Sequence, residues 1–379
     1  MNAPDRFIPV GRPHVTEAEK QAVVEVLESG WWTTGPKVFE FEEKVTAHIG
    51  QGLHGVALNS CTGGLFLALQ AHGIKAGDEV IVPTWTFVAT AHVVEWIGAV
   101  PVLCDVEPDT LNIDLAKARD LITERTKAIM PVHFAGYPCD MVGLRALADE
   151  FGLAVIEDAA HAIGAAHDGT RIGGHGFTSV FSFYVTKNLA CSEGGMVVTA
   201  DEALADKVRR LGYFGVNKKA FERYSSRGTW YYEVEELGYK YNMDNIHAAL
   251  GLVQLAKLEE MNDRRRAIAA RYRAEIKNVD FLRDDPRHRH IYHLFPVLLP
   301  EGVDRDTAFT TLRDNGVGTS VHFIPLHLHP YYRRLDQGQL PVATAAFPRA
   351  LSLPMYPSLT DEEVGYVIET FNKVLEAQT

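Results

Sequence analysis

The chain has 379 residues, of which 46% are hydrophobic, and its formal net charge is -12 at pH 7. This length favours two domains, and an acidic chain without a concentrated basic surface is not expected to bind nucleic acid. The four scattered cysteines indicate neither a disulfide framework nor a metal site, and the absence of a long apolar stretch leads us to expect a cytoplasmic protein without a membrane partner.

Short apolar stretches alternate with amphipathic stretches over the first part of the chain. We expect strands at residues 55–59, 79–82, 100–104, 128–132, 154–156, 179–183 and 196–198. The expected helices cover residues 62–70, 88–96, 114–122, 144–151 and 203–211. Strands that alternate with helices in this way predict a mostly parallel sheet that is covered on both faces.

The C-terminal part of the chain has a different pattern. Helical patterns cover residues 246–255 and 257–276, and short strands lead to a last helix at 362–375. We therefore expect a large domain at residues 1–251, with an N-terminal arm, and a smaller α+β domain at residues 252–379. In this smaller part His288, His290 and His293 have no carboxylate or thiol cluster that would complete a metal site, so surface or strand positions are expected for them.

Four chemically distinctive features follow the expected strands, at the sheet edge where ligands bind in this class of fold. Residues 60–64 (SCTGG) open a helix, whose free N–H groups suit a phosphate, although Ser and Thr are also ordinary helix caps. Trp85 and Phe87 follow the second strand, although core packing would explain either ring alone. Asp158 and His161 follow a later strand, where a capping role for Asp158 is an equally good explanation.

Lys187 is the fourth feature, and it lies between an apolar run and a glycine pair in residues 182–195 (SFYVTKNLACSEGG). An ammonium group is costly to bury without a partner, so this lysine either faces water or has a chemical role. Pyridoxal phosphate (PLP) needs a lysine for a Schiff base, a carboxylate for its pyridine nitrogen, an aromatic side chain for its ring and a helix start for its phosphate. Since the sequence offers all four, we expect PLP as the cofactor, bound covalently to Lys187.

The same residues lie in longer motifs that resemble the DegT/DnrJ family of sugar aminotransferases, which are PLP-dependent enzymes of the aspartate-aminotransferase fold (type I). The resemblance covers nearly the whole chain, and its motifs are specific when taken together. They are GWWTTGP (30–36), SCTGG (60–64), PTWTFVAT (83–90), EDAAH (157–161), SFYVTKN (182–188), EGG (193–195) and GYKYN (238–242).

Within the family, the chain is most similar to the members that make UDP-4-amino-4-deoxy-L-arabinose from a UDP-4-keto-pentose. It shares with them the GWxTTGPK opening, the GYKYN variant and a segment like residues 316–323 (GVGTSVHF). Residues 324–330 (IPLHLHP) depart from those members and follow the more general family pattern. The resemblance therefore implies a nucleotide-sugar substrate, with a UDP-sugar favoured.

The resemblance also implies a role for each matching residue. Lys187 is implied as the catalytic residue that bonds to the cofactor, and Asp158 as the partner of the pyridine nitrogen. Phe87 would lie on the cofactor ring, and His161, where many members carry Gln, would approach the ring hydroxyl. In the family a further phosphate ligand comes from the partner subunit, usually from a GYNYR segment that reads GYKYN here. The implied phosphate ligands are Thr62, Gly63, Ser182, Lys240 and Asn242, and the implied substrate contacts are Thr34, His322 and His327.

The function implied by the resemblance is transfer of an amino group from L-glutamate, leaving 2-oxoglutarate, to a nucleotide-linked 4-keto sugar. The product would be a 4-amino sugar for a cell-surface polysaccharide or lipid A of lipopolysaccharide, and the enzyme would be a homodimer with shared sites. The alternatives are a transaminase of a non-sugar amine or keto acid, a dehydratase, or a non-catalytic regulator. Lys187 argues against a dehydratase, because family dehydratases carry histidine there, and a regulator would be expected to lose Lys187 or Asp158.

Overall fold

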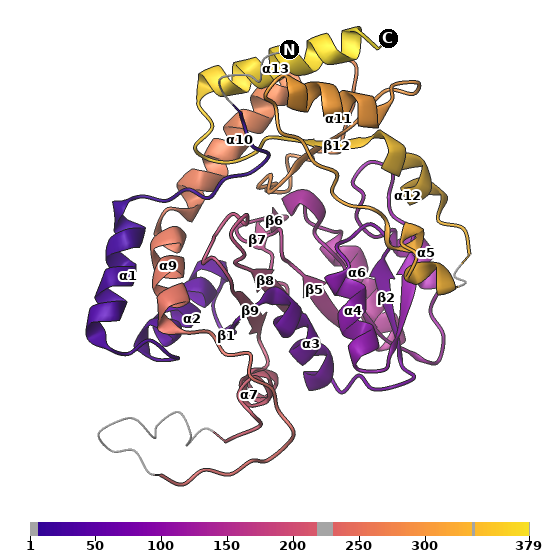
Figure 1. Cartoon of the computed structure of the whole chain (residues 1–379). Coiled ribbons are helices and arrows are strands. Elements are labelled where there is room, and N and C mark those ends of the chain that lie inside the picture. The colour runs from indigo at the N-terminus through magenta and orange to yellow at the C-terminus, as the bar shows by residue number, and fades with distance from the viewer. Residues whose placement is uncertain (1–6, 218–229, 336–337, 379) are drawn as a thin grey trace.

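The computed structural model describes residues 7–217, 230–335 and 338–378, and its largest element is a seven-stranded sheet (Figure 1). The strand order is β1-β9-β8-β5-β4-β2-β3. Strand β9 is antiparallel to both of its neighbours, whereas β8, β5, β4, β2 and β3 pair in parallel, so the sheet is mostly parallel as predicted. The bounds are β1 His54–Leu58, β2 Glu79–Pro83, β3 Val100–Cys104, β4 Thr126–Ile129, β5 Ala154–Asp158, β8 Thr178–Ser182 and β9 Gly195–Thr199.

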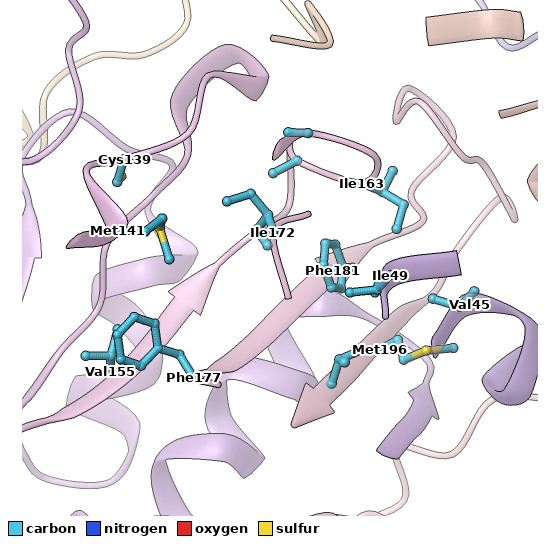
Figure 2. Packing of buried hydrophobic residues seen from close by; sticks show 14 of the residues in the cluster. Val45, Ile49, Cys139, Met141, Val155, Ile163, Ile172, Phe177, Phe181 and Met196 are labelled. Atoms are coloured by element: carbon cyan, nitrogen blue, oxygen red, sulfur yellow. The ribbon is translucent and has the colours of Figure 1, made fainter. Parts of the chain in front are cut away.

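Helices cover both faces of this sheet, because successive side chains of a strand point to opposite faces. In β9, Met196 packs with one buried cluster and Val197 with the cluster on the other face. Figure 2 shows the first cluster, in which Val45 and Ile49 approach Phe181 and Met196 of the sheet. The helices on this face are α2 Pro36–Ile49, α5 Leu115–Asp120 and α6 Met141–Phe151. Those on the other face are α3 Cys61–Ala71, α4 Ala89–Trp96 and α7 Glu202–Leu211.

The C-terminal part forms a second layer of structure with its own antiparallel sheet of order β10-β11-β12. Its core contains Phe295 and Val297 of β11 together with Tyr272, Leu312 and Phe371 from three helices. Figure 1 shows α10, α11 and α13 together at the top of the molecule, above the large sheet. The bounds are α9 Asn245–Ala256, α10 Leu258–Glu275, β10 Asp280–Phe281, β11 Phe295–Leu298, α11 Arg305–Asp314, α12 Pro341–Ala346, β12 Ala350–Leu353 and α13 Asp361–Glu376.

The first residues described connect the two parts. Ile8 pairs with Val317 and belongs to the C-terminal core, whereas α1 Glu17–Ser29 and α2 pack on α9. The domain boundary predicted after residue 251 falls inside α9 and stays a prediction.

Short elements complete the fold: the hairpin β6 Ala166–His167 and β7 Thr170–Arg171, and single 3₁₀ turns at Phe134–Gly136, Leu326–Leu328, Tyr332–Arg334 and Phe347–Arg349. Within the described ranges, no helix combines the length and the apolar character needed to cross a membrane.

Gly195, at the start of β9, shows why the glycine pair of the sequence is needed. A Cβ atom on this residue would lie only 2.4 Å from the carbonyl carbon of Ser60 and from the nitrogen of Cys61. Any side chain would therefore push β9 away from the start of α3. Glycine here lets the Lys187 loop, which ends at β9, lie directly beside that helix start.

Candidate active site

A cavity of about 450 Å³ lies at the carboxyl ends of the parallel strands. The loops that follow β1, β2, β5 and β8 all contribute to its wall, because the carboxyl ends of parallel strands meet at one edge of a sheet. Residues 293–294, 322–323 and 355 of the C-terminal part also line it. Of the predicted site residues, the cavity brings together Thr62, Phe87, Asp158, His161, Ser182, Lys187 and His322.

Lys187 lies in the loop between β8 and β9, where its own N–H donates to the carbonyl of Tyr184 at 2.9 Å. Its ammonium group faces the cavity and makes no hydrogen bond or ion pair with any other described residue. Enclosure by protein lowers the pKa of Lys187 to about 8, because burial disfavours the charged form more than Asp158 favours it. Near neutral pH a fraction of this side chain is therefore the free amine, which is the form that acts as a nucleophile or base.

Asp158 is the last residue of β5, and its carboxylate is held from two sides. Thr90 donates to Oδ2 at 2.8 Å, and the N–H of Ala160 donates to Oδ1 at 3.2 Å. Thr90 is itself paired with Thr86 at 2.7 Å, so a short polar chain fixes the carboxylate. Burial raises the pKa of Asp158, whereas these hydrogen bonds and Lys187 oppose the rise. A buried carboxylate of this kind gains stability from a cationic partner in the cavity.

The start of α3 provides the expected anion position. Ser60 is the N-cap residue, and its hydroxyl accepts a hydrogen bond from the N–H of Gly63 at 3.0 Å. Gly63 is thus buried inside the cap, whereas Thr62 lines the cavity. The N–H groups of Cys61 and Thr62 meet no acceptor in the described part of the chain, so they are free for a phosphate.

Aromatic and imidazole rings also line the cavity. Phe87 is 57% exposed at the rim and tilts toward Phe323, with ring centroids 5.8 Å apart, whereas Trp85 is fully buried. The ring of His161 stacks with that of Phe323, with centroids 5.9 Å apart, and is tilted against that of His293, with centroids 4.4 Å apart. Burial lowers the pKa of His161 well below its usual range, so its ring is neutral. Its buried Nδ1 atom has no hydrogen-bond partner among the described residues.

The predicted substrate residues separate into two groups. His322 lines the cavity, its Nδ1 lies 3.0 Å from the hydroxyl of Ser352, and burial lowers its pKa to about 4. His327 lies outside the cavity wall, where its two ring nitrogens contact the hydroxyls of Thr84 at 2.7 Å and Thr344 at 2.9 Å. Its expected role as a substrate contact stays a prediction.

Thr34, Lys240 and Asn242 also lie outside the cavity of their own chain, but they lie next to one another. Lys240 donates to Oδ1 of Asn242, and Nδ2 of Asn242 donates to the hydroxyl of Thr34 at 2.6 Å. The ammonium group of Lys240 lies 4.5 Å from the centre of the Tyr213 ring. The three residues thus form one polar chain, in which Lys240 is exposed and Thr34 and Asn242 are partly buried.

A separate cluster joins His288 to two residues that were not singled out in the sequence, His167 and Asp168. The hairpin β6–β7 brings them together, because Ala166 pairs with Arg289. Nδ1 atoms of the two histidines lie 3.8 Å and 3.7 Å from the two oxygens of Asp168. The two rings stack face to face at 4.3 Å, so their nitrogen lone pairs do not converge on one point as metal ligands would.

The cavity fits PLP on the evidence of its own unsatisfied groups. A lysine with a lowered pKa and no partner, a buried carboxylate and a buried histidine nitrogen without a partner all face one space beside a helix start. Thr90 and Asn188 support this arrangement and were not singled out in the sequence. The surface or strand position expected for His293 is wrong, because this residue is buried, lies outside the strands and lines the cavity. Thr90 stood in the quoted PTWTFVAT motif, four residues after Thr86, which is the spacing of neighbours on a helix.

Comparison with known proteins gives a consistent result. Residues 13–372 match the model of the DegT/DnrJ/EryC1/StrS aminotransferase family. The chain is 47% identical over 384 residues to the spore coat polysaccharide biosynthesis protein SpsC of Bacillus subtilis strain 168, with 98% of each protein covered. The PLP form of Spr1654 from Streptococcus pneumoniae, a candidate sugar aminotransferase, superposes with a TM-score of 0.91 at 32% identity, covering 98% of this chain and 100% of the other.

PseC of Helicobacter pylori, an aminotransferase involved in the biosynthesis of pseudoaminic acid, superposes with a TM-score of 0.89 at 28% identity, covering 98% of this chain and 100% of the other. Structures of Spr1654 are known in both PLP and PMP forms, and PLP is the cofactor of the family. The expected type I fold and the expected cofactor are thus confirmed. The chain therefore belongs to the DegT/DnrJ/EryC1/StrS aminotransferase family, as a sugar aminotransferase that uses PLP.

Proposed function

We propose that this aminotransferase moves the amino group of L-glutamate to C4 of a nucleotide-linked 4-keto sugar, with a UDP-sugar favoured. The observation that carries the proposal is Lys187, a lysine without a partner that faces a cavity together with the buried Asp158. The named relatives act in spore coat polysaccharide and pseudoaminic acid biosynthesis, which supports an amino sugar as the product. The amino sugar would serve a cell-surface polysaccharide or the lipid A of lipopolysaccharide.

Each residue of the cavity has a separate role in the proposed reaction. PLP, when bound, draws electrons away from the amino donor and so allows a proton to leave its α carbon. Lys187 is placed to take that proton and to return it, since its lowered pKa leaves part of it as free amine. Asp158 would hold the cofactor's pyridine nitrogen in its protonated form, and Thr90 keeps the carboxylate in place.

The positions of the other lining residues indicate which of them would contact the phosphate, the cofactor ring and the sugar. Thr62 and the free N–H groups at the start of α3 would hold the phosphate with Ser182, and Gly63 would contribute by letting the backbone approach. Phe87 would lie on the ring and His161 would approach its hydroxyl. His322, a neutral histidine at the wall, is proposed as a sugar contact, together with Thr34 and His327.

We also propose that the enzyme is a homodimer in which each chain completes the site of the other. Lys240 and Asn242 are not among the residues that line the cavity of their own chain, yet Lys240 is a cation at the family position that reaches the neighbouring phosphate. Asn242 donates to the hydroxyl of Thr34, which in turn donates to the carbonyl of Met243. These bonds hold Lys240 and Asn242 in a defined orientation, which a phosphate ligand of the partner subunit's site requires. The cluster therefore suits a phosphate that belongs to the site of the other subunit.

A substrate screen tests the proposal. The purified enzyme, loaded with PLP and supplied with L-glutamate, is offered UDP-, dTDP- and GDP-linked 4-keto sugars in parallel, and mass spectrometry follows the amino sugar nucleotide. We expect the fastest transfer to a UDP-linked 4-keto sugar. Transfer to a non-sugar keto acid but to none of the sugar nucleotides would overturn the proposed substrate class.

A further inference from the structure

Asn188, the residue after Lys187, is almost fully buried, and its amide makes three contacts. Its nitrogen Nδ2 donates to the carbonyl oxygen of Ile291 at 3.2 Å and to Oδ1 of Asn262 at 2.7 Å. Because a backbone carbonyl can only accept, the contact with Ile291 decides which end of the amide is nitrogen. The carbonyl end of Asn188 must then face the other way.

His293 lies at that other end. Its Nδ1 atom is 3.0 Å from Oδ1 of Asn188. An amide oxygen cannot donate, so Nδ1 of His293 must carry the proton, and in a neutral ring Nε2 is left with a bare lone pair. His293 lines the same cavity as Lys187, and its Nε2 makes no hydrogen bond with the described residues.

The surroundings of His293 keep its ring neutral. Burial lowers its pKa well below the usual range, and the charges or partial charges of His161, Lys187, Arg265 and His322 act in the same direction. Arg265 is a buried cation that forms no ion pair within the described ranges. Instead its Nη1 donates to the carbonyls of Met355 at 2.6 Å and His293 at 3.4 Å, so it also holds the backbone of His293 in place.

Several other acceptors in this part of the cavity are already engaged, although Nδ1 of the neighbouring His161 also lacks a partner among the described residues. The oxygens of Asp158 accept from Thr90 and from the backbone of residue 160, and Nδ1 of His322 is paired with a serine hydroxyl. The amines that bring N–H bonds into the cavity are Lys187 itself and the amino group of the donor. A bare, neutral imidazole nitrogen can accept a hydrogen bond from either amine.

We propose that Asn188 is a positioning residue that locks His293 in its Nδ1–H tautomer, so that Nε2 accepts an N–H bond from an amine in the cavity. The amine is either that of Lys187 or that of the incoming donor. This inference rests on the proposed amino transfer, since an amine is the group that the enzyme moves. It assigns to residues 188 and 293 a shared role that neither residue could have alone.

Nitrogen NMR of the PLP-loaded enzyme labelled at histidine tests the tautomer without any reaction. The His293→Gln spectrum identifies the signals of His293 by their loss. We expect a neutral ring protonated at Nδ1 throughout the neutral pH range. In Asn188→Asp, the carboxylate stabilises the imidazolium, so the ring should take up a proton at clearly higher pH. A ring protonated at Nε2, or a titration that Asn188→Asp leaves unchanged, would overturn the proposal.

A pair of variants tests the acceptor itself. Glutamine places a carbonyl oxygen near the position of Nε2, whereas leucine fills similar space without an acceptor. We expect His293→Leu to lose about tenfold or more in kcat/KM for the glutamate half-reaction, and His293→Gln to keep most of it. His290→Gln is the matched control, because His290 is a buried histidine of the same segment that contacts the carbonyl of Ala135 outside the cavity wall.

Two further readings of the His293→Leu enzyme distinguish the two amines. A higher KM for glutamate, with unchanged PLP binding, identifies the incoming amine as the donor. A shift to lower pH of the midpoint for covalent rebinding of PLP identifies Lys187, since its ammonium form loses an acceptor. If neither the KM for glutamate nor the pH midpoint of PLP rebinding changes, or if only the KM for the sugar changes, Nε2 of His293 does not accept a hydrogen bond from an amine. The glutamate half-reaction needs no sugar, so an error in the proposed sugar substrate leaves this test intact.

Discussion

Replacing Lys187 by methionine should stabilise the cofactor-free protein, although it removes the catalytic group. Methionine has a similar length and no charge, so the variant fills the same space without the cost of burying an ammonium. The side chain of Lys187 forms no ion pair with the described residues, and the nearby charge of Asp158 offsets this cost only in part. The wild-type protein is therefore expected to carry a strained site that the cofactor relieves when it bonds to the lysine.

The size of the effect follows from the pKa of Lys187, which falls from 10.5 to about 8 in the folded protein. A difference of this size corresponds to about 3 kcal/mol at neutral pH, as an upper limit because water in the cavity screens the charge. Since the folded pKa lies below the unfolded one, the unfolded chain binds more protons between these values, and the stability of the wild type rises with pH there. The advantage of Lys187→Met should therefore shrink to about 1 kcal/mol at pH 10.

Urea unfolding of the two cofactor-free proteins, followed by tryptophan fluorescence at pH 7 and pH 10, measures both numbers. Lys75→Met is the matched control, because Lys75 is exposed, and its stability should differ from that of the wild type by less than about 0.5 kcal/mol at either pH. If Lys187→Met is no more stable than the wild type at pH 7, the ammonium group of Lys187 is well solvated and the argument from burial is wrong.

Three further predictions concern other residues. Asp158→Ala should slow the single-turnover reaction with glutamate by orders of magnitude, because the pyridine nitrogen loses its counter-ion; an unchanged rate would remove Asp158 from the site. Lys187→Ala chains mixed with chains that carry both Lys240→Ala and Asn242→Ala should recover activity, because each mixed dimer contains one intact site. If both variants are inactive alone and the mixture is inactive too, the sites are not shared. Arg209→Ala should lower the free energy of unfolding in urea by about 3 kcal/mol or more, because it leaves the buried Glu42 without the cation that pairs with it at 2.8 Å. A decrease below about 1 kcal/mol would mean that other groups stabilise the carboxylate of Glu42.

The strands and helices could be predicted because their signals are local. The apolar run at 179–183 and β8 Thr178–Ser182 agree within a residue, as do the expected helix at 203–211 and α7. The gathering of Asp158 and Lys187 at one edge could be predicted too, since parallel strands place their carboxyl ends together. These inferences required only the order of elements along the chain.

The supporting contacts of the site could not be predicted, because they join segments far apart in the sequence. Thr90 and Asp158 are 68 residues apart, and His293 and Asn188 are 105 residues apart. Nothing local distinguishes His293 from His290, yet one lines the cavity and the other faces the carbonyl of Ala135. Only the way in which the C-terminal part packs on the large sheet decides between them.

The position of His327 illustrates the same limit. It follows Pro325 in a turn at Leu326–Leu328, and this turn directs its ring to Thr84 and Thr344 rather than to the cavity wall. The motif resemblance fixes which segment is near the site but leaves open which side chains of the segment enter it.

Borohydride reduction of the PLP-loaded enzyme, followed by proteolysis and mass spectrometry, shows whether Lys187 is the residue that bonds to the cofactor. Reduction makes the bond between cofactor and lysine permanent, so the modified peptide identifies the lysine that carries PLP. We expect the added mass on the peptide that contains Lys187, and no added mass in the Lys187→Ala protein. Modification of a different lysine, or of none in an enzyme that still transfers amino groups, would contradict this expectation.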